Sequence, residues 1–147
     1  MKLLSRNTDY AVRALMILGV RERDYTSARS ISEVQRIPYS FLRKILQTLI
    51  QNGLVESREG GKGGFRLAVA PERIKLINLI RIFQGGIKFS ECMFRKKVCF
   101  NRANCALRER ILEIEHFVTK KFSALTIAEL IKKTELKRKT KLKRKKQ

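Results

Sequence analysis

Acidic residues, histidine and long apolar runs are scarce in this chain of 147 residues, and each scarcity excludes a class of protein. The single histidine, His116, and the lack of a nucleophile motif leave no catalytic constellation, so we expect the protein not to be an enzyme. No segment approaches the roughly 18–20 apolar residues of a membrane span. Two leucines near the start are too few for a signal peptide. We therefore expect a cytoplasmic protein with no membrane partner and no small-molecule substrate.

The shortage of acids leaves a large positive charge. Against 13 Asp and Glu stand 34 Lys and Arg, which gives a formal net charge of +21. Solubility does not need that much charge, so the composition predicts a polyanionic partner. Nucleic acid is the first candidate and an anionic membrane surface is the second. Residues 132–147 hold ten Lys or Arg and one acid, and we expect a disordered tail there that adds sequence-independent attraction to phosphates.

Cysteine is also scarce, but its three copies are clustered. Cys92, Cys99 and Cys105 follow a C-x6-C-x5-C spacing. The odd count and the reducing compartment that we expect favour a shared metal centre over a disulfide framework. Zinc usually takes four ligands with shorter gaps between cysteines, so the spacing does not favour a zinc site. Plain reduced thiols are the alternative to a metal centre.

The first half of the chain predicts a helix-turn-helix. Apolar spacing indicates helices over residues 9–23, capped by Asn7 or Thr8, and over residues 31–36, where Ser30 and Glu33 have the spacing of a capping box. A third helix is expected over residues 39–52 after a turn at Pro38. Its N-terminal half carries side chains suited to the major groove, namely Tyr39, Ser40, Arg43, Lys44 and Gln47. A solvated face of a helical hairpin is the alternative for these residues.

A basic hairpin follows the third helix. Strands are expected over residues 54–58 and 65–68, joined by a turn with four glycines, among them Gly61 and Gly63. Arg58, Lys62 and Arg66 supply positive charge, and glycine lets a backbone approach phosphates closely. The turn matches neither phosphate-loop pattern. A basic hairpin directly after a helix-turn-helix predicts a winged helix.

The second half predicts a helix for dimerisation. A short apolar helix is expected over residues 76–83. Beyond the cysteine loop, Asn104 is expected to cap a long amphipathic helix over residues 105–123. Such a helix suits pairing with a second copy, although an ordinary core helix has the same pattern. Thr126 and Glu129 form a capping box that opens a last short helix.

These elements predict a mainly α protein: a winged helix-turn-helix DNA-binding domain with a long C-terminal dimerisation helix. We expect four parts. Residues 1–84 form the DNA-binding domain, 85–105 the cysteine-containing loop, 105–131 the dimerisation helix with a short C-terminal helix, and 132–147 the basic tail.

Three stretches resemble one known family. They are residues 4–15 (LSRNTDYAVRAL), 37–46 (IPYSFLRKIL) and 52–67 (NGLVESREGGKGGFRL). Together with the cysteine triplet they closely resemble the Rrf-two family of bacterial winged-helix regulators, which includes IscR and NsrR. The resemblance covers about residues 1–131, and the wing motif is its most specific part.

The resemblance implies a homodimer on palindromic double-stranded operator DNA and an iron–sulfur cluster on Cys92, Cys99 and Cys105. It places Ser40, Phe41 and Arg43 of the recognition helix, and Lys62 with the wing glycines, at the DNA. Arg108 stands where IscR has a histidine ligand. Asp9 matches the aspartate that the partner subunit supplies in NsrR, which favours a [4Fe-4S] over a [2Fe-2S] cluster. The first cysteine gap is one residue longer than in the family, and Arg43 replaces a glutamate of IscR.

The sequence therefore predicts a DNA-binding transcriptional regulator, and specifically a repressor. We expect it to sense redox state, nitric oxide or iron–sulfur status through the cluster. One alternative is a winged-helix regulator without a cluster that senses thiol oxidation or a small ligand. Another is a small iron–sulfur redox protein, and a third is an adaptor on a membrane surface.

Overall fold

The computed structural model of the chain describes residues 3–21, 24–89, 99 and 101–144, with side chains as far as Leu136. Its elements follow the order α1 (Arg6–Val20), α2 (Ala28–Gln35), α3 (Tyr39–Gln51), β1 (Val55–Arg58), β2 (Gly64–Leu67), a short 3-10 helix (Pro71–Arg73), α4 (Leu76–Gln84), α5 (Ala106–Ala124) and α6 (Ile127–Arg144). The predicted fold class, a mainly α winged helix-turn-helix, is confirmed.

One apolar core joins the first four helices to the wing. Helices α1 and α3 each place apolar residues three and four positions apart on one face, which is the spacing that turns a stripe of side chains inward. Leu15, Leu18, Leu42, Leu46 and Leu49 are all fully buried. Ile127, at the start of α6, is fully buried in the same core, so the C-terminal helix is anchored to the N-terminal half of the chain.

Helix α1 begins three residues earlier than predicted, and neither Asn7 nor Thr8 caps it. Ser5 is the cap, because its hydroxyl accepts a hydrogen bond of 3.1 Å from the amide of Thr8. Thr8 is fully buried, and its hydroxyl donates to Gln84 Oε1 at 2.9 Å. The residue that we assigned to capping therefore ties α1 to the end of α4.

Two further caps differ from the prediction. Helix α2 is capped by Ser27, whose hydroxyl accepts from the amide of Ser30 at 3.2 Å, so Ser30 lies inside the helix. Cys105, not Asn104, occupies the cap position of α5 and makes no side-chain capping bond there. Hydroxyls at several neighbouring positions satisfy the same sequence rule, and tertiary packing selects among them.

The wing is a two-stranded antiparallel hairpin with an extra bridge. Glu56 pairs with Arg66 and Arg58 with Gly64 across the strands. Thr26 forms an isolated bridge to Phe65, with two backbone hydrogen bonds of 2.9 Å. The segment before α2 is thus fixed to the outer edge of β2.

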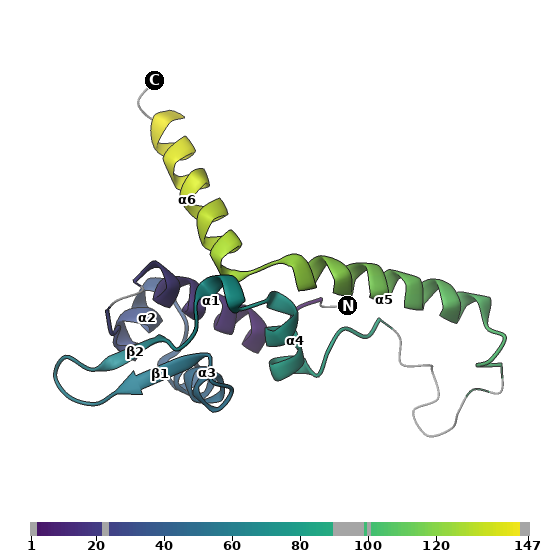
Figure 1. Ribbon diagram of the computed structural model, residues 1–147, viewed down its shortest axis with the longest axis horizontal. Helices are drawn as coiled ribbons and strands as arrows, with labels where there is room; N and C mark the ends of the chain where they lie inside the picture. The colour runs from purple at the N-terminus through teal and green to yellow at the C-terminus, as the bar shows by residue number, and fades with distance from the viewer. Residues whose placement is uncertain (1–2, 22–23, 90–98, 100, 145–147) are drawn as a thin grey trace.

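Helices α5 and α6 extend away from the body in different directions (Figure 1). Lys75 bridges Thr126, and this contact joins the start of α4 to the α5–α6 junction. The predicted capping box is confirmed, since the amide of Glu129 donates to Thr126 Oγ1 at 3.2 Å and the amide of Thr126 donates to Glu129 Oε2 at 3.3 Å.

Helix α6 is much longer than predicted, and our expectation of a disordered tail is wrong for residues 132–144. The helix continues to Arg144. Lysine, arginine, leucine and glutamate are good helix formers, and no proline or glycine follows Gly86. Charge density, on which we based disorder, does not outweigh these propensities here. Among the described residues no helix is long and apolar enough to cross a membrane.

Two neighbouring residues of α3 should separate stability from surface function. Leu42 is fully buried, whereas Phe41 is 47% exposed. Leu42→Ala is expected to lower the free energy of unfolding by about 2–5 kcal/mol, because it leaves a cavity in the core. Phe41→Ala, the matched control, should cost less than about 1 kcal/mol. Denaturant unfolding measures both, and equal losses would contradict this assignment of the helix faces.

Candidate nucleic-acid interface

The polar side chains of α3 form one continuous exposed face. Helix α3 buries Leu42, Ile45, Leu46 and Leu49. The opposite face carries all six residues that were predicted to meet DNA on this helix, and all six are exposed: Tyr39, Ser40, Phe41, Arg43, Lys44 and Gln47. Long donors on an exposed helix are what major-groove recognition requires.

A hollow of about 380 Å³ separates α3 from the wing. Arg43 and Gln47 line it from α3, and Arg58 lines it from β1. Three predicted DNA-binding residues, from two consecutive elements of the chain, therefore line one hollow. An arginine on each side makes the hollow electropositive, with Glu59 as its one acidic lining residue. That charge suits a phosphate backbone.

The wing turn is built around glycines that cannot be replaced without steric conflict. A Cβ atom added at Gly63 would lie 2.1 Å from the carbonyl oxygen of Arg58, and one at Gly64 would lie 2.6 Å from that of Thr26. By contrast, a Cβ at Gly61 would meet nothing within 4 Å. Close backbone packing thus accounts for Gly63 and Gly64, whereas Gly61 remains free to approach DNA.

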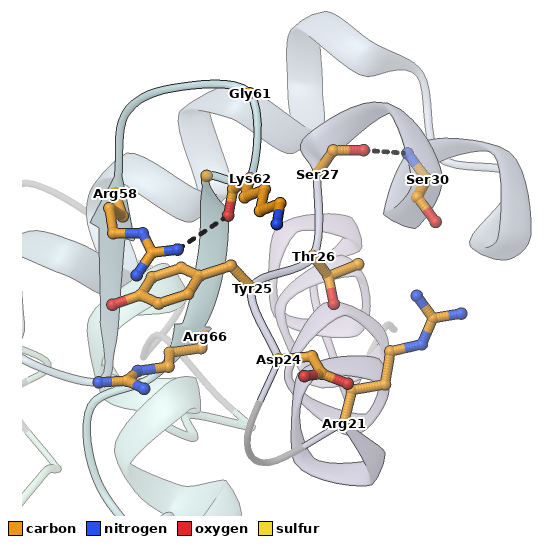
Figure 2. Close-up of a pocket in the computed structure, with 11 residues that line it drawn as sticks. Arg21, Asp24, Tyr25, Thr26, Ser27, Ser30, Arg58, Gly61, Lys62 and Arg66 are labelled. Atoms are coloured by element: carbon orange, nitrogen blue, oxygen red, sulfur yellow. Dashed lines mark hydrogen bonds between the residues drawn. The ribbon is translucent and has the colours of Figure 1, made fainter.

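Arg58 organises the wing turn from the outside. Its guanidinium lies 4.5 Å from the centroid of the Tyr25 ring and donates a hydrogen bond of 3.2 Å to the carbonyl of Lys62. Figure 2 shows this arrangement beside a second hollow, of about 630 Å³. Four cationic side chains line this hollow, together with Asp24, Gly61 and Gly63: Arg21, Arg58, Lys62 and Arg66.

Tyr25 and Glu56 are functional candidates that sequence reasoning missed. The Tyr25 hydroxyl donates to Glu56 Oε1 at 2.8 Å, and Arg66 Nε donates to the same oxygen at 2.5 Å. The bond from Tyr25, and then that from Arg66, hold the pKa of Glu56 below its usual range. The bond to Glu56 raises the pKa of Tyr25 and that of Arg66. Alternation along the strands would have placed Glu56, Arg58 and Arg66 on one face, but nothing in the sequence points to Tyr25.

The predicted metal ligands are only partly described. Cys99 and Cys105 are free thiols with intermediate exposure, and Cys92 lies outside the described residues. Cys105 stands at the N-terminal end of α5, and its side chain makes no capping hydrogen bond there. Within the described ranges, no three His, Cys, Asp or Glu side chains come together as metal ligands would.

Asp9 lies in the first turn of α1 and is exposed. Its carboxylate is 3.5 Å from Arg13 Nη1, and Arg13 also donates to the carbonyl of Gln35 at the end of α2. The structure does not bring Asp9 into a described group with Cys99 and Cys105. His116 is exposed on α5, as expected of a solvated residue, and Arg108 has intermediate exposure.

The fold and this interface agree with a family match. The family model Rrf2, described as an iron-dependent transcriptional regulator, matches residues 4–133. This chain belongs to the Rrf2 family. It is therefore a DNA-binding helix-turn-helix transcriptional regulator, and the resemblance seen in its wing and recognition-helix motifs is confirmed.

Individual Rrf2-type proteins agree with that assignment. The helix-turn-helix repressor NsrR of Streptomyces coelicolor is 31% identical over 130 residues, with 87% of each chain covered. The structure of CymR, the global cysteine regulator of B. subtilis, matches with a TM-score of 0.76 and 24% identity over 90% of this chain and 98% of CymR. T. potens IscR matches with a TM-score of 0.73 and 24% identity over 91% and 88%. The two structural matches show the fold.

Replacing Tyr25 by phenylalanine should raise the pKa of Glu56 toward its ordinary value. The tyrosine hydroxyl is the largest cause of the lowered value. A ¹³C NMR titration of the glutamate carboxyls measures the change, and Tyr39→Phe on α3 is the control that should leave the Glu56 titration as it is. An unchanged Glu56 titration in Tyr25→Phe would mean that the hydrogen bond does not form in solution.

The pKa shifts of Glu56 and Tyr25 set the pH range over which the hydrogen-bonded group of Tyr25, Glu56 and Arg66 is stable. Because the pKa of Glu56 is lower in the folded protein, its contribution to stability is present above the unfolded value and is lost as pH falls through the folded value. The raised pKa of Tyr25 acts in the opposite direction, so its contribution is lost as pH rises through the folded value. The hydrogen bonds that join Tyr25, Glu56 and Arg66 are therefore expected to be intact throughout the neutral pH range.

Proposed function

We propose that this Rrf2 protein is a homodimeric repressor whose affinity for operator DNA responds to an iron–sulfur cluster on Cys92, Cys99 and Cys105. The observation that carries the proposal is the position of two free thiols, Cys99 and Cys105, directly before a helix that has no buried residue. The cluster that senses the signal and the helix that forms the dimer would then adjoin at the start of α5, while α3 and the wing would bind DNA.

The DNA-binding part is supported by the shape and charge of the interface. Arg43 and Gln47 project from the recognition helix into the hollow that Arg58 shares. Arginine and glutamine make bidentate contacts to guanine and adenine edges. Lys62, exposed at the wing turn, suits a phosphate contact that carries no sequence preference.

Dimerisation is supported by the apolar face of α5. Leu107 is 70% exposed, Ile114 55% and Phe117 60%. At the other end of the helix, Phe122 and Leu125 pack against the core. Helix α5 leaves the body of the protein (Figure 1). Its exposed apolar side chains would aggregate or be covered, and the same helix of a second copy is the simplest cover.

The side chains present fit an iron–sulfur cluster by their chemistry. Thiolates are the usual ligands of such clusters, and the positive end of α5 at Cys105 would favour an anionic one. Asp9 of the partner subunit would be the fourth ligand, since a carboxylate can replace a thiolate. The cluster would supply an iron centre that reacts with oxygen or nitric oxide. The [4Fe-4S] form is favoured over the [2Fe-2S] form.

A hydrogen-bond network would connect the cysteine loop to α1. Gln84 ends α4 just before the loop, and its Oε1 accepts bonds of 2.9 Å from the amide of Ser5 and from the hydroxyl of Thr8. Its Nε2 donates to the carbonyl of Leu3 at 3.2 Å. On the far side, the amide of Phe89 donates to Glu115 Oε1 on α5 at 2.7 Å. A change in the conformation of the loop would thus displace the start of α1, and α1 packs against α3.

Anaerobic purification should give a coloured protein with bound iron and acid-labile sulfide. Cys99→Ser and Cys105→Ser are expected to lose both, because each removes a thiolate ligand. Asp9→Asn should shorten the lifetime of the cluster in air, while Asp24→Asn, the matched control at another exposed acid, should leave it unchanged. Visible absorbance and iron analysis provide the measurements.

A colourless wild-type protein without iron, even after reconstitution, would contradict the cluster. In that case the free thiols favour sensing by thiol oxidation. Mass spectrometry after peroxide treatment would then show oxidation at Cys99 or Cys105, and the DNA-binding part of the proposal would still stand.

The dimer should depend on the apolar face of α5. Wild-type protein is expected to have about twice the chain mass of 17.1 kDa in solution. Ile114→Glu should give monomers, because it places a charge in an apolar contact. His116→Glu, at an exposed residue two positions from Ile114 and on the other side of the same helix, is the control that should stay dimeric. Light scattering during size-exclusion chromatography measures the mass, and a dimeric Ile114→Glu would exclude this face.

A further inference from the structure

The outer face of the wing carries a preorganised group of charged side chains. In antiparallel strands the side chains alternate between two faces. Val55, Phe65 and Leu67 lie on the face toward the core. Glu56 and Arg58 of β1 and Arg66 of β2 lie on the other face, and the strand register sets Glu56 directly opposite Arg66.

Tyr25 reaches this outer face from outside the hairpin. The bridge between Thr26 and Phe65 holds the preceding residue beside β2. Its hydroxyl and Arg66 Nε then donate to the same carboxylate oxygen, Glu56 Oε1, at 2.8 and 2.5 Å. The carboxylate therefore joins three chain segments: the residues before α2, β1 and β2.

The Tyr25 ring also holds two arginines. The guanidinium of Arg58 lies 4.5 Å from the ring centroid and that of Arg66 4.8 Å, and Figure 2 shows the ring between them. Two cations at such a spacing repel each other. The electron-rich ring faces and the Glu56 carboxylate offset this repulsion. Without the Glu56 carboxylate, the repulsion between the two guanidinium groups would be offset less, and the arginines would be held less firmly at these positions.

Arg58 connects this group of side chains to the wing turn. Its second contact is the hydrogen bond to the carbonyl of Lys62. The exposed turn otherwise closes through the amide of Gly63, which donates to the carbonyl of Gly60 at 2.9 Å. Exposed ion pairs add little to global stability, so the group is better suited to fixing a loop than to holding the fold together.

We propose that Tyr25 and Glu56 are positioning residues for DNA binding. They hold Arg58 and Arg66 on the outer face of the wing and, through Arg58, fix the turn that presents Lys62 to the DNA backbone. A prepositioned side chain binds with a smaller loss of conformational entropy. The inference rests on the DNA-binding function and is independent of the iron–sulfur cluster.

The proposal makes a prediction that runs against simple electrostatics. Removing a carboxylate from a surface that faces DNA should strengthen binding, because it removes repulsion of phosphates. A positioning role predicts the opposite for Glu56. Glu59 is the matched control, because it is exposed and three residues further along the same hairpin, and it lacks the contacts of Glu56 to Tyr25 and Arg66.

The test compares Glu56→Ala with Glu59→Ala. The probe is a duplex of about 30 base pairs selected from a random pool with the wild-type protein, measured by fluorescence anisotropy at several salt concentrations. We expect Glu56→Ala to bind about two- to fivefold more weakly and Glu59→Ala to bind as tightly as wild type or more tightly. Glu56→Gln, which keeps an oxygen acceptor, should recover most of the loss.

Two further measurements keep the result interpretable. Tyr25→Phe changes no charge and keeps the ring, and it should weaken binding about twofold because the hydroxyl bond is lost. Thermal unfolding should show all four variants folded at the assay temperature. The proposal would be overturned if Glu56→Ala and Glu59→Ala both bound DNA more tightly than wild type. If Glu56→Ala fails to fold, unchanged DNA affinity of Tyr25→Phe would overturn it instead. A wild-type protein that selects no duplex would refute DNA binding itself.

Discussion

The buried face of α1 is the constraint on which the rest of the structure depends. Ala11, Ala14, Leu15 and Leu18 are fully buried and bring α1 against α3, α4 and the wing. At Gly19 the approach of α6 is so close that an added Cβ would lie 2.6 Å from Ile131 Cδ1. Because one helix contacts the recognition helix, the helix before the cysteine loop and the C-terminal helix, small shifts of α1 reach all three.

The candidate DNA-binding surface is built on that core from side chains that alternate between buried and exposed positions, rather than from any single motif. Helix α3 buries leucines on one side and exposes Arg43 and Gln47 on the other. Strand β1 does the same with Val55 inward and Arg58 outward. Since both elements are fixed from beneath, their exposed side chains can change with the operator while the core stays the same. That separation explains how relatives at 24–31% identity keep one fold.

The sequence predicted the elements well where periodicity is strong and poorly where neighbouring residues compete. The limits of α3 and of the wing followed from leucine spacing and glycines. The caps of α1 and α2 did not, because Ser5 and Thr8, or Ser27 and Ser30, satisfy the same rule until packing chooses one. Tyr25 could not be found at all, because its role arises from a bridge between residues far apart in the chain, Thr26 and Phe65. The length of helix α6 was underestimated because we gave charge more weight than helix propensity.

The few contacts between the part of the chain around α5 and the part that contains α3 and the wing suggest how related regulators could respond to different signals. In the described residues, the cysteine-proximal half meets the DNA-binding half at identifiable points: Gln84 with Ser5 and Thr8, the bridge from Lys75 to Thr126, and the last turn of α5. Most of α5 makes no buried contact with the body. A change of sequence between α4 and α5 would therefore leave α3 and the wing intact as long as those points are kept. The charge that binds DNA and the thiols that would sense the signal are thus free to vary separately, which is a physical reason why one fold serves both NsrR-like and CymR-like proteins.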